Sequence, residues 1–121
     1  MLIYKRKFLV QKTLQYAIKI GRLLQKRGGN AAVVTLGARG ACVFEERGET
    51  WLPAFPVQGP LDTVGAGDAT SAGTLLGLTL GLSLPAAALL GSCVSSITIQ
   101  QIGVTGTATL DQVAERLRTL G

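Results

Sequence analysis

The spacing of hydrophobic positions changes several times along the first half of the chain, and each change predicts a new element. Residues 11–26 place apolar side chains at helical spacing with lysines and arginines on other faces, so they predict an amphipathic helix that a glycine pair ends. The apolar, β-branched run at 31–36 predicts a buried parallel strand that is covered on both faces. Residues 41–46 and 49–54 flank a short turn and predict a hairpin.

The second half of the chain has the pattern of three helices. Three prolines keep residues 53–61 extended and irregular. Residues 66–80 and 83–100 then predict two apolar helices, and a threonine followed three residues later by a glutamine predicts the start of a last helix at 110–120. This order of elements indicates one α/β domain, with an open sheet and helices packed against it.

Charge is concentrated at the N-terminus. The first 27 residues hold eight of the 12 basic residues and no acid, whereas the rest of the chain holds seven acids. We interpret residues 1–10 as a basic N-terminal extension and residues 11–121 as the domain. Aromatic residues are sparse in the basic stretch and no recognised nucleic-acid motif accompanies it, which favours a solvated helix face over a nucleic-acid partner.

Two further patterns concern the cellular compartment. The uncharged stretch 72–91 is long enough to suggest a membrane helix, but a glycine, a serine and a proline at 81–85 favour two buried helices. A membrane-associated helical hairpin stays an alternative to our expectation of no membrane partner. The chain has no histidine, and Cys42 and Cys93 are isolated, which excludes a Cys/His zinc site and predicts a reducing, cytoplasmic compartment.

The segment DTVGAGD, residues 62–68, predicts an anion-binding turn at the start of a helix. Small residues there allow the amide groups to face a ligand, and the helix dipole adds partial positive charge. Asp68 then has two interpretations. It caps the helix, or it removes the proton of a hydroxyl that attacks phosphorus. The residues alone leave both open.

Three segments together resemble the PfkB-type, ribokinase-like carbohydrate kinases. DTVGAGDATSAG is similar to the second signature of that family, and VVTLGARGACVF is similar to its strand, turn and strand near the nucleotide phosphates. IGVTGTATLDQVAERL is similar to the C-terminal loop and final helix. The segments follow the order of the family, and the resemblance covers residues 12–121. It implies the C-terminal portion of a ribokinase-like α/β fold, an open sheet with flanking helices.

The resemblance implies phosphoryl transfer from ATP to a sugar or nucleoside hydroxyl. Asp68 would be the general base, and the amides of Gly65, Ala66 and Gly67 would form the anion hole. The nucleotide-binding positions would be Thr35, Gly37, Gly40 and Gly103, with residues 96–103 beside the adenine. Asp62 and the carbonyl of Val64 would hold a monovalent cation, K⁺ in several members, and Mg²⁺ would accompany ATP.

Family members are much longer, and their N-x-x-E segment, which helps to place magnesium, does not occur in this chain. No metal-ligand set is predicted here. We therefore expect the C-terminal half of a kinase, truncated or partial, that is inactive alone and associates with a missing N-terminal half or with copies of itself. A non-catalytic nucleotide- or phosphate-binding module is the alternative. Nothing in the sequence identifies the sugar.

Overall fold

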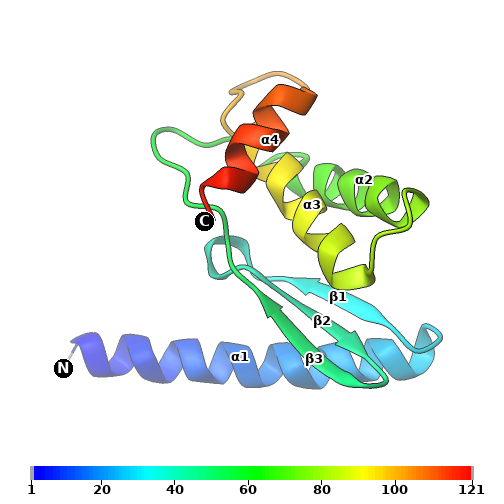
Figure 1. Cartoon of the computed structure of the whole chain (residues 1–121). Coiled ribbons are helices and arrows are strands. Elements are labelled where there is room, and N and C mark those ends of the chain that lie inside the picture. Colours follow the sequence, from blue (N-terminus) through cyan, green and yellow to red (C-terminus); the bar gives the residue numbers. More distant parts are fainter. Residues whose placement is uncertain (1, 121) are drawn as a thin grey trace.

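The computed structural model describes residues 2–120, with side chains from residue 14 onward. A three-stranded sheet forms the middle layer, with one long helix on one face and two helices on the other (Figure 1). In chain order, the elements are α1 (Leu2–Arg27), β1 (Ala32–Thr35), η1 (Gly37–Arg39), β2 (Ala41–Glu45), β3 (Gly48–Leu52), α2 (Ala66–Thr79), α3 (Leu84–Thr98) and α4 (Leu110–Arg118). The predicted α/β class is confirmed.

The sheet has the order β1-β2-β3, and both pairs of neighbours are antiparallel. The predicted hairpin is confirmed, because Glu45 pairs with Gly48 across a two-residue turn. The prediction of a parallel strand covered on both faces is wrong. Residues 32–34 are only half-buried, and β1 lies at an edge, antiparallel to β2. The five residues between β1 and β2 are too few for the crossover that a parallel pair requires.

The first helix is longer than its predicted span of 11–26. Residues 2–20 contain neither glycine nor proline, so nothing in them prevents the helix from starting well before residue 11. The helix is therefore continuous across residue 10, and the division into an extension and a domain stays a prediction. Gly29 and Asn30 end the helix in the left-handed backbone region, with φ of 86° and 89°.

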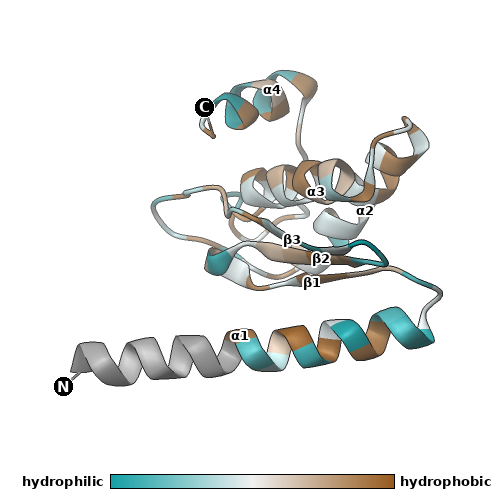
Figure 2. Cartoon of the chain, turned by 60° about the horizontal axis from the view of Figure 1, so that its bottom comes forward, coloured by the Kyte–Doolittle hydropathy of each residue, from teal (hydrophilic) through white to brown (hydrophobic). Residues whose placement is uncertain are grey.

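From residue 14 onward, α1 alternates between hydrophilic and hydrophobic residues, whereas β1 and β2 are mainly hydrophobic (Figure 2). Cys42, Val43 and Phe44 of β2 are fully buried. Gly21 of α1 lies against the ring of Phe44, where a Cβ atom would overlap the ring atoms. The Arg22 guanidinium lies 5.4 Å from the centre of the same ring. The central strand is thus enclosed by helices on both faces.

The two apolar helices predicted at 66–80 and 83–100 are confirmed as α2 and α3. The Ser83 hydroxyl caps α3 by accepting from the Ala86 amide at 3.4 Å. The helices meet through glycines, since a Cβ atom at Gly73 would lie 2.7 Å from the Cα atom of Gly91. Among the residues described, no helix combines the length and the apolar composition that a membrane crossing requires.

Candidate active site

A cavity of about 570 Å³ lies between the turn that follows β1 and the beginning of α2. The turn contributes Thr35, Gly37 and Gly40, and the helix contributes Ala66 and Gly67. Segments about 30 positions apart in sequence therefore meet at one cavity. Five of the residues predicted for nucleotide binding or for the anion hole line it.

The turn at 36–40 has a backbone that only glycine adopts easily at two positions. The Leu36 amide donates to Gly40 O at 2.7 Å, and the Gly40 amide donates to Gly37 O at 3.1 Å. Gly37 has a φ of 58° and Gly40 a φ of 91°. A Cβ atom at Gly40 would overlap Leu52 O, whereas one at Gly37 would meet nothing within 4 Å. Gly40 is thus required by packing, while Gly37 leaves open space beside the cavity.

The start of α2 presents amide groups that the protein leaves free. Gly65 begins the helix with a φ of 83°. The Ala66 amide donates to Thr63 O at 3.1 Å, so one of the three predicted anion-hole amides is already bonded. Within residues 2–120 the amides of Gly65, Gly67 and Asp68 have no acceptor. The Asp68 amide, which the sequence interpretation did not include, is therefore a further candidate donor to an anion.

Asp68 lies in the first turn of α2, next to Gly67, and its side chain is exposed. It does not line the cavity itself. No side-chain cap bond is made at the start of α2, and within the described chain no hydrogen bond or ion pair occupies the Asp68 carboxylate. The capping interpretation thus has no hydrogen bond to support it.

Asp62 joins two loops through both of its carboxylate oxygens. Oδ1 accepts from the Val64 amide at 3.1 Å, and Oδ2 accepts from the Gly103 amide at 2.9 Å. The bonds from Gly103 and then Val64 hold the pKa of the Asp62 carboxyl below its usual value. The link is therefore complete at neutral pH and is lost only in acid, as the pH falls through the lowered folded-state pKa.

Gly103, predicted beside the nucleotide, contacts Asp62 and does not line the cavity. Asp62 and Val64 also lie outside the cavity lining, on the Gly103 side of the turn. In the part of the chain that the structure describes, no three acidic, cysteine or histidine side chains are grouped to hold a metal ion. The assignment of Asp62 and the Val64 carbonyl to a monovalent cation stays a prediction.

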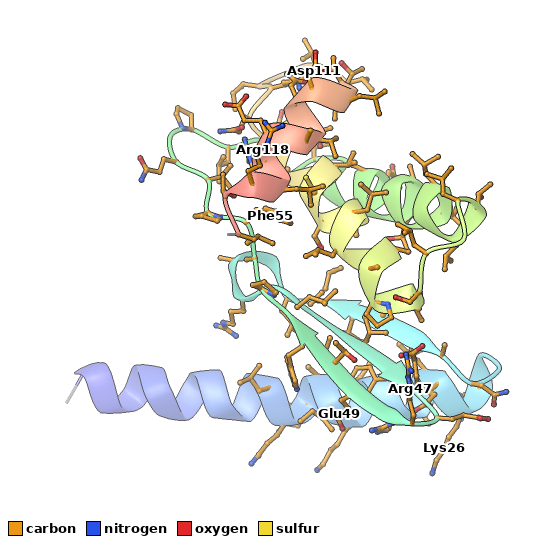
Figure 3. All side chains as sticks on the ribbon, in the orientation of Figure 1. Lys26, Arg47, Glu49, Phe55, Asp111 and Arg118 are labelled. Atoms are coloured by element: carbon orange, nitrogen blue, oxygen red, sulfur yellow. The ribbon has the colours of Figure 1, made fainter. Side chains whose placement is uncertain are left out.

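Sequence reasoning missed most of the remaining cavity wall. Phe55, which lies in the segment after β3 (Figure 3), and Val57 give the cavity an apolar side. Ser92 and Ser95 present hydroxyl groups from α3, one helical turn apart. Small polar residues at i and i+3 in an otherwise apolar helix were the signal that would have identified this face.

The model of the pfkB family carbohydrate kinases matches residues 5–110. The chain belongs to that family. Its match begins inside the stretch 1–10 that we interpreted as an extension.

Related proteins agree with the family. The uncharacterised sugar kinase YegV of Escherichia coli (strain K12) is 38% identical over 84 residues, which are 69% of this chain and 26% of that protein. The nucleoside kinase of Methanocaldococcus jannaschii, an archaeal member of the ribokinase family, is 30% identical with a TM-score of 0.68, over 74% of this chain and 30% of that one.

A third comparison concerns the fold alone. Arabidopsis thaliana ribokinase, whose structure is complexed with ribose and ATP, is 22% identical with a TM-score of 0.67, over 74% of this chain and 29% of that one. The predicted ribokinase-like fold is thus confirmed. The chain spans between a quarter and a third of the length of these proteins.

Proposed function

We propose that this chain provides the ATP-binding part and the catalytic base of a kinase that transfers a phosphoryl group to a sugar or nucleoside hydroxyl. The observation that carries the proposal is the cavity in which Gly37 faces the start of α2, where amides without acceptors are available to an anion. The names of the related proteins, a sugar kinase and a nucleoside kinase, support the same class of acceptor.

The lining of the cavity suits ATP in two parts. Phe55, Val57 and Ile99 give an apolar wall for a purine base. The glycines at 37 and 67 let backbone amides approach phosphate oxygens without side chains between them. Those amides would stabilise the charge on the transferred group, and Asp68 would take the proton of the attacking hydroxyl.

Metal ions enter the proposal in a limited way. The described residues offer no ligand set for Mg²⁺, so it would reach the site on the ATP phosphates. Asp62 would offer a monovalent cation such as K⁺ its two carboxylate oxygens. Each of these oxygens already accepts a hydrogen bond from a backbone amide.

The experiment that tests the proposal replaces Gly37 with asparagine. Asparagine tolerates the left-handed backbone of Gly37, so its side chain should enter the open space beside the cavity with little strain. We expect ATP affinity to fall about tenfold, equivalent to ~1.4 kcal/mol, while the free energy of unfolding changes by less than about 1 kcal/mol. ATP titration by calorimetry and thermal unfolding measure the two quantities.

Gly29→Asn is the matched control, since Gly29 has a φ of 86°, has no atom near its Cβ position and ends α1 away from the cavity. Equal loss of affinity in both variants, or none in Gly37→Asn, would contradict the proposal. A chain that binds ATP in the expected place but turns over no sugar when completed by an N-terminal portion would instead be the non-catalytic nucleotide-binding module.

We also propose that the chain associates, with a copy of itself or with the N-terminal portion of a kinase. Within residues 2–120, the outer edges of β1 and β3 have no strand partner. On α2, Leu75, Leu76 and Leu78 are exposed, Leu75 to 64%. We expect light scattering across a dilution series to show a dimer or larger species. A compact monomer at high concentration would contradict this expectation.

The proposed location is the cytoplasm, which cell fractionation tests. Cys42 and Cys93 are free and buried, and burial raises the pKa of both thiols. Buried, protonated thiols suit a compartment in which disulfides do not form.

A further inference from the structure

Among the described residues, one side chain of the last helix donates hydrogen bonds to the cavity wall. Arg116 of α4 crosses to the end of α3, where its Nη1 donates to Ser96 O at 3.2 Å and to Ser96 Oγ at 3.1 Å. Its Nη2 donates to Gln100 Oε1 at 2.6 Å. The planar guanidinium therefore bonds both to the last turn of α3, at Ser96, and to the turn that follows the helix, at Gln100, which fixes these two segments relative to each other.

The bond to Ser96 O satisfies a carbonyl group that the helix leaves without a partner. At the end of α3, the carbonyls of Ser95, Ile97 and Thr98 accept from the backbone amides of residues 99, 100 and 101. The Ser96 carbonyl accepts from Arg116 instead. The positive charge also lies at the negative end of the helix dipole. Removing the guanidinium would leave this carbonyl without its donor in a partly buried place.

The same serine is part of the cavity wall. Ser96 is only 5% exposed, and it lines the cavity together with Ile99. Its hydroxyl donates to Cys93 O at 2.7 Å and accepts from Arg116, so both directions of the hydroxyl are fixed. Arg116 does not line the cavity itself. Its contact with Ser96 is made from behind the wall.

We propose that Arg116 is a positioning residue for the cavity, holding Ser96 and the last turn of α3 in the place where they form its wall. The consequence for ATP rests on the proposed function. The loops on the other side of α3 reinforce the same segment, because the Asp62 amide donates to Ile99 O at 2.7 Å. The wall is thus held from the α2 side by Asp62 and from the α4 side by Arg116.

The test compares three single variants and one double variant of the full chain. Arg116→Met removes the guanidinium. Arg118→Met makes the same charge change on the same helix (Figure 3), at an exposed arginine without a partner in the described residues. Val113→Ala weakens the packing of α4 on the cluster of Phe55, Cys93 and Ile97, and it leaves the guanidinium of Arg116 in place. The readouts are amide hydrogen exchange at residues 96–103, titration with a fluorescent ATP analogue, and thermal unfolding.

We expect Arg116→Met to raise exchange at residues 96–103 at least about tenfold and to weaken binding of the analogue about tenfold, the scale of charge-assisted hydrogen bonds. Arg118→Met should stay within about twofold of the natural chain in both. Val113→Ala should lower the unfolding temperature but change the affinity less than about twofold at temperatures where the chain is folded. Ser96→Ala added to Arg116→Met should weaken binding little further, because the two residues act together.

Unchanged exchange at 96–103 in Arg116→Met would overturn the proposal. The proposal would also be overturned if Arg116→Met showed faster exchange but bound the analogue as tightly as Arg118→Met does. An affinity loss in Val113→Ala as large as that in Arg116→Met would overturn it too. If the natural chain does not bind the analogue at all, the proposed function fails, and the exchange comparison still decides whether Arg116 holds the wall.

Discussion

Replacing Asp68 with asparagine is expected to lower turnover at least about a hundredfold, since loss of a general base usually costs roughly 10²–10⁴ in rate. The measurement needs a chimera that joins this chain to the N-terminal portion of a pfkB-family kinase, because the chain alone spans about a quarter of the length of its relatives. ATP affinity should change less than about threefold, because Asp68 does not line the cavity. The carboxylate is exposed at the start of α2, where it can meet a hydroxyl beside the free amides.

Asp111→Asn is the matched control, because Asp111 is also an exposed carboxylate in the first turn of a helix. Both substitutions remove an acid from the positive end of a helix dipole, an effect of a few tenths to about 1 kcal/mol on stability. Turnover that is near normal in Asp68→Asn, or equally reduced in Asp111→Asn, would leave Asp68 with that electrostatic role alone.

Replacing Gly91 with alanine is expected to destabilise the fold by about 3 kcal/mol, the upper part of the range for an overpacked core. A Cβ atom at Gly91 would overlap Thr70 O and Thr74 Oγ1 on α2. Thr70 O belongs to the helix backbone, so it cannot move without separating the two helices. Urea unfolding at equilibrium measures the free energy of unfolding.

Gly67→Ala makes the same chemical change near the start of α2, where a Cβ atom would meet nothing within 4 Å. Alanine has the higher helix propensity, so this variant should be neutral or more stable by up to about 1 kcal/mol. Similar stability in the two variants would show that α2 and α3 can move apart at little cost and would contradict the close contact.

The sequence predicted the elements better than it predicted their pairing. The glycine, serine and proline at 81–85 separated α2 from α3. The threonine and glutamine at 109 and 112 form the capping box expected at the start of α4. The apolar composition of 31–36, however, is shared by buried parallel strands and by short edge strands. The five-residue link to β2 distinguishes them, and the sequence interpretation did not use it.

The parts of the candidate site that the sequence predicted are its glycine-rich turns. Gly37, Gly40 and Gly65 have positive φ values, and their place in the motifs brought both sides of the cavity into the prediction. Gly103 was assigned to the nucleotide through the family resemblance, as the last residue of the segment 96–103, but its amide donates to Asp62. The contact of Arg116 with Ser96 joins positions 20 apart through a surface arginine, and no local pattern indicates such a pair.

The order of the strands in the sheet is the order of the strands in the chain. Each strand pairs with its neighbour in sequence, and α2 packs on α3, the next helix along the chain. The loops that must close to form these pairs are short, so the loss of chain entropy on closing them is small. Formation of the sheet and of the α2–α3 pair is therefore expected to be governed by local contacts, without the slow search for distant partners that a parallel sheet requires.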